Sequence, residues 1–316
     1  MTSEEQAAPP PIVAIAGPTA AGKSALALQL VEHLQGRAEI ISVDSAQVYL
    51  GMDIGTAKPD AATRARVPHH LLDLIDPAEA YSAARFAADA RRLIAEIRGR
   101  GNRPLLVGGT MLYFRALLQG LSDLPPADAA FRARTEAEAA QLGWAALHAR
   151  LAEVDPPSAA RLHPNDAQRI QRALEIHHLS GEPASRQFLR PHGAAWDDAV
   201  LRIAVCPPQR QLLHQRIEQR FRDMMARGFV EEVARLRARG DLRPALPSMR
   251  AVGYRQLWRH LDGEYGLEQA IELGQIATRQ YAKRQLTWLR SESGWVWIDP
   301  TEPNAAGVVL NVMESA

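Results

Sequence analysis

GPTAAGKS, residues 17–24, is the stretch that decides the fold of this chain. It matches the pattern Gly-x-x-x-x-Gly-Lys-Ser/Thr, in which backbone N–H groups surround phosphate oxygens, the lysine adds a positive charge and the hydroxyl binds Mg²⁺. The apolar run IVAIAG, residues 12–17, precedes it, and the amphipathic SALALQLVEHL begins at Ser24. A strand, a glycine-rich loop and a helix in this order predict a phosphate-binding loop, or P-loop. The motif does not say which molecule carries the phosphates.

Two more apolar runs extend the strand pattern. EIISVDS covers residues 39–45 and RPLLVGGT covers residues 103–110, with the helical FAADARRLIAEIRGRG between them. Alternating strands and helices predict an α/β fold with a parallel sheet, whose ligands gather at the carboxyl ends of the strands. We therefore expect Asp44 and Thr110, each at the end of a run, to face the P-loop.

The pattern changes after Gly120. The next segments are helical and punctuated by proline pairs, and strand signals return only with VLRIAVC at 200–206 and WVWID at 295–299. We predict a disordered tail over residues 1–11, a P-loop core domain formed by 12–120 and 200–316 with C-terminal helices, and a helical insert domain over 121–199.

Composition excludes several classes of protein. The start MTSEEQAAPPP is acidic and proline-rich, which is not typical of a signal peptide, and no window approaches 18 uninterrupted apolar residues. A single cysteine, Cys206, excludes an internal disulfide and a zinc site built on clustered cysteines. We expect a monomeric protein of the reducing cytoplasm, with no membrane partner.

Basic residues are unevenly distributed. Residues 200–290 hold 17 Lys and Arg against 9 Asp and Glu, an excess that suits a polyanion partner but also a solvated helical surface. Lysine is rare, because the only lysines among 37 basic residues are Lys23, Lys58 and Lys283. A compact ammonium differs from a guanidinium fork, so Lys58 and Lys283 become candidates beside the P-loop lysine, with chance as the alternative.

Several polar residues have ordinary alternatives. Asp44 could hold a metal's water, cap a helix or act in a site; the polar, glycine-containing DSAQVYLGMDIGTAKP that it begins favours an active-site loop. The glycines of the GGT at 108–110 also suit a tight turn. The histidine pairs at 69–70 and 177–178 lack metal-ligand spacing and suggest structural histidines. The polar side of QRIQR, residues 168–172, could be a solvated helix face.

Taken together, seven ordered motifs resemble the bacterial tRNA dimethylallyltransferases over about residues 12–290. The motifs are GPTAAGKS, IISVDSAQVYLGMDIGTAKP, PHHLLD, LLVGGTMLYFRALLQGL, HPNDAQRIQRALEI, AVGYRQLW and ATRQYAKRQLTWLR. The resemblance implies transfer of a dimethylallyl group from dimethylallyl diphosphate to the exocyclic amine of the adenosine 3′-adjacent to the tRNA anticodon. The phosphates are then those of an isoprenoid diphosphate.

The resemblance also implies roles for individual residues. Asp44 would be the catalytic base, Thr19 and Arg220 would be catalytic residues that clamp the leaving diphosphate, and Ser24 would bind the cofactor Mg²⁺. The residues expected to bind diphosphate are Gly17, Pro18, Thr19, Ala20, Ala21, Gly22, Lys23 and Ser24. Those expected to contact the anticodon stem-loop of tRNA are Asp44, Ser45, Ala46, Gln47, Thr110, Arg132, Gln168, Arg169, Ile170, Gln171, Arg172, Arg250, Ala251, Val252, Gly253, Tyr254, Arg255, Lys283, Arg284, Gln285, Leu286, Thr287, Trp288, Leu289 and Arg290. Leu50 departs from the basic residue usual at its position, which leaves one backbone contact open.

Three rival functions share parts of this pattern. A nucleotide or nucleoside kinase would use the same loop and would transfer phosphate from ATP, but it gives no reason for the helical insert. An adenylate prenyltransferase would accept free AMP and would not need the basic segment. A non-enzymatic RNA-binding protein would bind tRNA without releasing diphosphate.

Overall fold

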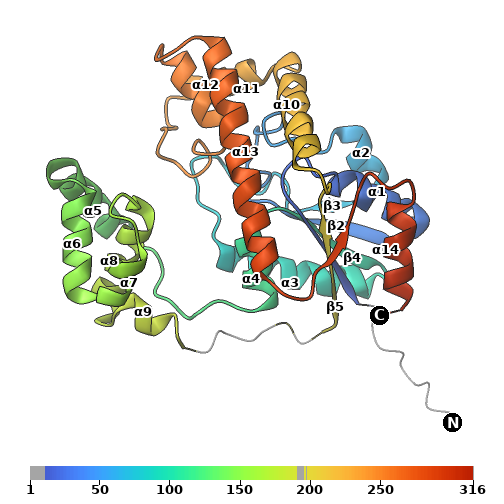
Figure 1. Ribbon diagram of the computed structural model, residues 1–316, viewed down its shortest axis with the longest axis horizontal. Coiled ribbons are helices and arrows are strands. Elements are labelled where there is room, and N and C mark those ends of the chain that lie inside the picture. Colours follow the sequence, from blue (N-terminus) through green and yellow to red (C-terminus); the bar gives the residue numbers. More distant parts are fainter. Residues whose placement is uncertain (1–10, 191–195, 197, 316) are drawn as a thin grey trace. The chain divides into compact units, whose positions relative to one another are not determined.

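The computed structural model describes residues 11–190, 196 and 198–315 (Figure 1). The tail predicted over residues 1–11 lies, except for Pro11, outside the described residues. The described chain divides into two compact units, one formed by residues 11–117 and 198–315 and the other by residues 118–190 and 196.

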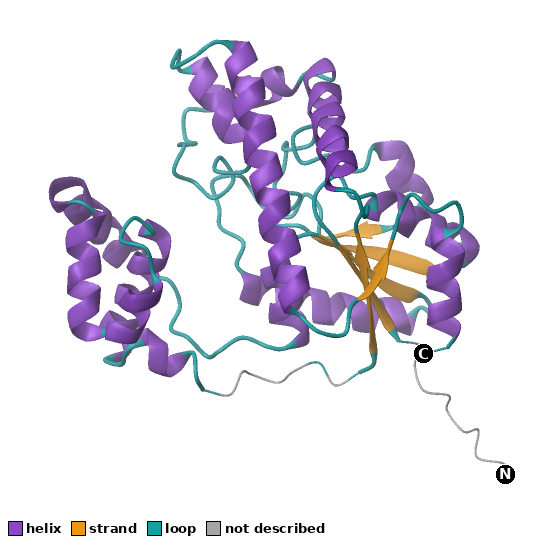
Figure 2. Ribbon diagram, in the orientation of Figure 1, coloured by secondary structure: helices purple, strands orange, loops and turns teal. Residues whose placement is uncertain are grey.

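A six-stranded sheet forms the centre of the first unit, with every neighbouring pair of strands parallel (Figure 2). The strand order is β3-β2-β4-β1-β5-β6. In chain order the strands are β1 (Ile12–Ala16), β2 (Ala38–Val43), β3 (His69–His70), β4 (Arg103–Gly108), β5 (Val200–Val205) and β6 (Val296–Ile298). Every residue of β1 and β2 is buried, because helices cover both faces of a parallel sheet. The predicted α/β parallel fold is confirmed; β3 was not predicted, since two residues carry no periodicity.

Nine helices of the described chain accompany this sheet. They are α1 (Lys23–His33), α2 (Ala61–Arg66), α3 (Ala83–Gly99), α4 (Met111–Leu118), α10 (Arg210–Ala226), α11 (Phe229–Ala238), α12 (Tyr254–Leu261), α13 (Leu267–Ser291) and α14 (Ala305–Glu314). Helices α1 and α14 lie side by side against the sheet, where Leu30 and Val309 join Val13 in one apolar cluster (Figure 1). The 25-residue α13 packs against α10 and α12.

The second unit is helical throughout its described residues. Its helices are α5 (Ala129–Leu142), α6 (Trp144–Val154), α7 (Pro156–Arg161), α8 (Ala167–Ser180) and α9 (Ala184–Gln187). Leu147, Leu151 and Ile170 are among the buried residues of its core. Helix α8 begins at the cap residue Asp166, whose carboxylate accepts a hydrogen bond from the Arg169 N–H, and ends at Gly181 in the left-handed conformation.

Within the described ranges, we find no helix of the length and apolar character that crossing a membrane requires.

Candidate active site

The P-loop closes tightly against the sheet. A Cβ added at Gly17 would lie 2.3 Å from the Val205 carbonyl oxygen, so only glycine lets the loop pass this close to β5. Ala20 and Gly22 have positive φ angles of 62° and 101°, which curl the chain into the start of α1. Within the described chain, no side chain caps that start. The N–H groups of the first turn of α1 therefore remain for an anion.

The side chain of Lys23 folds back onto the P-loop. Its Nζ donates a hydrogen bond to the Pro18 carbonyl oxygen at 2.7 Å. Burial and the Arg220 guanidinium lower the pKa of the Lys23 ammonium to about 8, while Asp44 and Cys206 act in the opposite direction. Burial also lowers the pKa of Arg220, and Asp44 again opposes the shift. Two cations and one carboxylate therefore share a poorly hydrated site, where an added anion would be stabilised.

Asp44 lies where β2 and β4 end together. The strands pair Val43 with Gly108, and a Cβ at Gly108 would lie 2.0 Å from the Val43 carbonyl oxygen. The Thr110 hydroxyl oxygen accepts a hydrogen bond from the Ser45 N–H at 3.0 Å, and an Asp44 carboxylate oxygen accepts one from the Ala46 N–H at 2.8 Å. Strand pairing therefore brings Asp44 and Thr110 to one edge of the sheet, beside the P-loop.

Gln47 turns inward from the same loop. Its Oε1 accepts a hydrogen bond from the Ser42 hydroxyl at 2.8 Å, and its Nε2 donates to the Thr56 carbonyl oxygen at 3.2 Å. The side chain therefore joins the two ends of the loop that follows Asp44.

Lys58 stabilises the loop that follows Asp44. Its buried Nζ donates to the Tyr49 carbonyl oxygen at 2.5 Å and forms ion pairs with Asp53 at 2.9 Å and Asp73 at 2.5 Å. A compact ammonium fits three oxygens around one point, which a planar guanidinium does not. Lys58, which became a candidate because lysine is rare in this chain, therefore has a structural role in this loop.

Glu232 of α11 is a functional support that sequence reasoning missed. Its carboxylate accepts hydrogen bonds from the N–H groups of Asp53 at 2.9 Å, Ile54 at 2.8 Å and Gly55 at 3.1 Å, and from the Tyr254 hydroxyl at 2.6 Å. Only 1% of this residue is exposed. Glu232 lies in an ordinary amphipathic helix, so nothing in the local sequence distinguishes it from an exposed glutamate.

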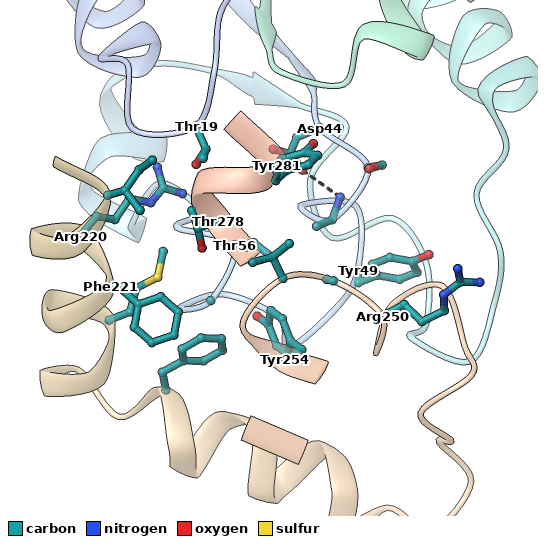
Figure 3. Close-up of a pocket in the computed structure, with 18 of the residues that line it drawn as sticks. Thr19, Asp44, Tyr49, Thr56, Arg220, Phe221, Arg250, Tyr254, Thr278 and Tyr281 are labelled. Carbon is teal, nitrogen blue, oxygen red and sulfur yellow. Dashed lines mark hydrogen bonds between the residues drawn. The ribbon is translucent and has the colours of Figure 1, made fainter. Parts of the chain in front are cut away.

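A pocket of about 300 Å³ is lined by Asp44, by Thr19 of the P-loop and by residues of α10 and α11 (Figure 3). Thr19, Asp44 and Arg220 contribute polar groups, while Ile217, Phe221, Met224 and Phe229 contribute apolar ones. The apolar wall is closely packed: a Cβ at Gly55 would lie 2.2 Å from the Phe229 ring, and one at Gly274 would lie 2.4 Å from the Phe221 ring. One pocket therefore combines a polar end with an apolar surface.

Helix α13 brings further side chains to this pocket. Thr278, Tyr281 and Arg284 line it at helical spacing. Burial, followed by the Asp44 carboxylate, raises the pKa of the Tyr281 hydroxyl, whereas hydrogen bonds with Thr110 and Gln285 lower it. Tyr281 was not predicted; it lies beside Asp44 in Figure 3.

The predicted segment 283–290 divides between two environments. Gln285 and Leu289 are buried, and Leu286 packs against an apolar cluster. The Gln285 Oε1 accepts a hydrogen bond from the Thr19 N–H at 2.9 Å, and its Nε2 donates to the Gly109 carbonyl oxygen at 2.7 Å. The residues of this segment whose side chains are exposed are Lys283, Arg284, Thr287 and Arg290.

Residues 250–255, which were predicted to contact tRNA, also lie in different environments. Arg250, Ala251 and Val252 line the pocket. Gly253 has a φ of 90°, and a Cβ there would lie 2.8 Å from the Phe229 ring, so its role is to let the chain turn under that ring. Tyr254 is buried and Arg255 is exposed.

Arg132 and Arg172, two of the predicted residues of the second unit, belong to an ion-pair network within it. Buried Glu175 accepts hydrogen bonds from Arg132 Nε at 2.8 Å and Arg172 Nη1 at 2.5 Å. Gln171 donates to the Arg132 carbonyl oxygen at 3.1 Å, and Ile170 is part of the apolar core. Exposed residues of the QRIQR stretch are Gln168 and Arg169, the latter paired with Asp166.

His69, His70 and His178 of the two histidine pairs contact other residues of the protein. His69 Nδ1 lies 2.8 Å from the Val67 carbonyl oxygen, and His70 Nε2 lies 2.7 Å from buried Glu39, which also binds Arg100. The His178 ring stacks on Phe131. The described residues contain no group of three or more His, Cys, Asp or Glu that could hold a metal ion by themselves.

Comparisons with known proteins agree with one another. The model of the IPP transferase family matches residues 47–292. The tRNA dimethylallyltransferase of Acidovorax sp. strain JS42 is 60% identical over 286 residues, 89% of this chain and 88% of that protein. The tRNA dimethylallyltransferase of Paraburkholderia phymatum is 55% identical over 314 residues, 98% of each chain.

Solved structures give the same result. The full-length tRNA isopentenylpyrophosphate transferase of Bacillus halodurans matches with a TM-score of 0.68 and 38% identity, over 96% of this chain and 97% of that one. A eukaryotic dimethylallyltransferase acting on tRNA matches with a TM-score of 0.80 and 28% identity, over 97% of this chain and 79% of that one.

Proposed function

The chain belongs to the IPP transferase family and is a tRNA dimethylallyltransferase, and we propose a role in this reaction for each group of residues at its candidate site. The enzyme transfers a dimethylallyl group from dimethylallyl diphosphate to the exocyclic amine of the adenosine 3′-adjacent to the tRNA anticodon, releasing diphosphate. The allylic C–O bond breaks, a C–N bond forms to the amine, and the amine loses one proton. The site must therefore bind an anionic leaving group and accept a proton.

The P-loop is the leaving-group site in this proposal. Negative charge grows on the diphosphate as the allylic C–O bond breaks. Lys23 and Arg220 are the two cations beside the loop, and burial weakens their hydration, as their lowered pKa values indicate. The bound diphosphate draws Lys23 away from the Pro18 carbonyl oxygen, and Thr19 contacts it from the pocket side. This electrostatic arrangement, with Asp44 in the same cluster, is the observation that carries the proposal.

The donor set at the loop fits Mg²⁺. Mg²⁺ prefers oxygen ligands and usually keeps several waters, binding through one or two protein groups and the substrate's phosphates. The exposed hydroxyl of Ser24, in the first turn of α1, is an oxygen donor of this kind. Ser24 would hold the ion against the diphosphate, where its charge would favour departure of the leaving group.

Asp44 is the proposed base. An adenine amine is a weak nucleophile until its proton is taken, and a carboxylate at hydrogen-bond distance can accept that proton. One Asp44 oxygen already accepts the Ala46 N–H, which fixes the orientation of the carboxylate. The adenosine must leave its stack to reach this pocket, with Ser45, Ala46 and Thr110 beside it. The dimethylallyl group then lies against the apolar wall.

Exposed cations hold the tRNA backbone in this proposal. Lys283, Arg290 and Arg255 of the core, and Arg169 of the helical domain, are exposed and suit phosphate contacts. Residues 121–199 serve as the tRNA-binding domain and residues 12–120 with 200–316 as the catalytic core. The enzyme works as a monomer in the cytoplasm.

One incubation tests the proposal. The protein, unmodified tRNA and dimethylallyl diphosphate are combined with Mg²⁺, and the tRNA nucleosides are analysed by mass. We expect one adenosine per substrate tRNA to gain a dimethylallyl group, with one diphosphate released. AMP in place of tRNA and ATP in place of the isoprenoid diphosphate test the rival functions; a phosphorylated product or prenylated AMP would contradict the proposal.

A further inference from the structure

One buried amide joins the two halves of the active site. Gln285 of α13 is 5% exposed. Its Oε1 accepts the hydrogen of the Thr19 N–H, in the P-loop, and its Nε2 donates to the Gly109 carbonyl oxygen, at the end of β4. We propose that Gln285 is a positioning residue, which fixes the P-loop in its diphosphate-binding conformation and sets its place relative to the base. This inference rests on the proposed function of the P-loop.

The link extends to Asp44 through short steps. Gly109 is followed by Thr110, whose hydroxyl oxygen accepts the Ser45 N–H, and Ser45 follows Asp44. On the other side, Thr19 lines the pocket together with Asp44. The leaving-group side and the base side of the pocket are therefore joined through a single carboxamide.

The chemistry of the side chain explains why glutamine suits this position. The site needs one acceptor and one donor at the same reach, and a neutral amide supplies both. An ionised glutamate could accept from Thr19, but it would place a carboxylate oxygen against the Gly109 carbonyl oxygen. Asparagine is one methylene shorter and cannot span both partners.

Gly109 leaves room for the Gln285 carboxamide because it has no side chain. A Cβ added at Gly109 would lie 2.2 Å from the Gln285 Nε2 and 3.0 Å from the Gly17 carbonyl oxygen. The GGT turn thus needs its second glycine because the side chain of Gln285 lies against it.

The orientation of the Thr19 N–H matters for the loop as a whole. Because Gln285 accepts this N–H, the peptide before Thr19 has one orientation, and the left-handed Ala20 follows directly. Without Gln285 the loop loses the partner that selects this conformation, so the cost falls on binding of diphosphate and on its alignment in the transition state.

The test uses kinetics and diphosphate binding of the full-length protein. Gln285→Ala should lower kcat/KM for dimethylallyl diphosphate by about 10- to 100-fold, the range expected when buried polar groups lose their partner. Its affinity for inorganic diphosphate should fall as well. Gln280→Ala is the matched control, since Gln280 is an exposed glutamine of the same helix.

A double-mutant cycle separates positioning from general damage. Gly109→Ala displaces the Gln285 side chain and should resemble Gln285→Ala in its diphosphate affinity. If both changes act through the same amide, the double variant should bind diphosphate no more weakly than the worse single variant. Multiplied losses would show that the two residues act independently and would overturn the proposal.

Gln285→Glu supplies a second test that does not depend on truncation. A protonated glutamate donates and accepts as the amide does, so its activity relative to wild type should rise as the pH falls through the titration of that carboxyl. A flat ratio, or wild-type kinetics in Gln285→Ala, would overturn the proposal. Lys23→Ala, run in parallel, reports on the P-loop itself: wild-type kinetics in that variant would instead overturn the proposed leaving-group site.

Discussion

The Tyr254 hydroxyl donates a 2.6 Å hydrogen bond to the Glu232 carboxylate, which also accepts three consecutive backbone N–H groups from residues 53–55. A carboxylate with four donors is well satisfied even though it is buried. These contacts bind α11 and α12 to the loop that follows Asp44. The shape of the pocket therefore depends on a carboxylate that does not itself line the pocket.

Tyr254→Phe removes one of these donors without changing the ring. Hydrogen bonds to charged groups contribute about 1.5–3 kcal/mol, so we expect a loss of that order in the free energy of unfolding. Urea denaturation of the two proteins measures it. Tyr265→Phe, which loses a bond to a backbone carbonyl oxygen at 3.0 Å, is the control and should cost less. Equal losses would contradict the special role of the Glu232 partner.

Asp44→Asn keeps the size of the side chain and removes its basicity. We expect kcat to fall by roughly 10² or more, the range for a general base, while the Kd for tRNA changes little. Single-turnover prenylation at saturating substrates measures the chemical step. A near-normal rate would remove Asp44 from the base role.

Lys23→Ala should raise KM for dimethylallyl diphosphate and lower kcat, because charge on the leaving group increases toward the transition state. The wild-type protein should also show a pH effect that the variant lacks. The pKa of Lys23 is lowered to about 8, so most of its charge is present at pH 7 and is lost as the pH rises past 8. Affinity for inorganic diphosphate, measured by calorimetry between pH 7 and 9, should fall more steeply for wild type than for Lys23→Ala. Parallel profiles would contradict this assignment.

Glu39 should contribute to acid sensitivity. Hydrogen bonds, chiefly from Arg100, lower the pKa of this buried carboxyl to about 2. A lowered pKa gives stability that is complete above the unfolded value of 4.5 and is lost as the pH falls toward 2. Glu39→Gln should cost about 3 kcal/mol at pH 7 and flatten the loss of stability between pH 4.5 and 2. Exposed Glu302→Gln is the control, and a wild-type acid profile in Glu39→Gln would contradict the prediction.

Cations of the two units should respond differently to substitution. Lys283→Ala should reduce the slope of log K for tRNA against log salt by about 0.7 to 0.9, the value of one phosphate contact. Arg172→Ala should chiefly destabilise the helical unit, because it removes one of the partners of buried Glu175. Titrations of tRNA at several salt concentrations, together with thermal unfolding, distinguish the two. An unchanged slope in Lys283→Ala would place the tRNA contact elsewhere.

The sequence predicted the fold and the family because both depend on local patterns. The P-loop has a fixed spacing, its strand is uniformly apolar, and the seven motifs follow one another in order. Parallel pairing then brings Asp44 and Thr110 to the same edge of the sheet. These inferences need only periodicity and strand direction.

The rest of the site depends on contacts between residues far apart in the chain. Gln285 reaches Thr19, although the sequence pointed to it only as a tRNA contact, and Glu232 reaches Asp53 with no local signal in its helix. The sequence also cannot tell an exposed cation from a paired one: Arg172 and Lys283 look alike in composition, yet only Arg172 lies against a buried carboxylate. Burial separates these cases, and burial is a property of the assembled fold.

The closure of the P-loop by β5 and α13 also sets the order in which a newly made chain acquires its activity. Four of the six strands, β1 to β4, lie within the first 117 residues and leave the ribosome before β5 and α13. The contacts that complete the loop, Gly17 against Val205 and Thr19 against Gln285, come from segments translated after the helical unit. A nascent chain therefore has the motif early, but the proposed diphosphate site can be completed only once α13 has been made.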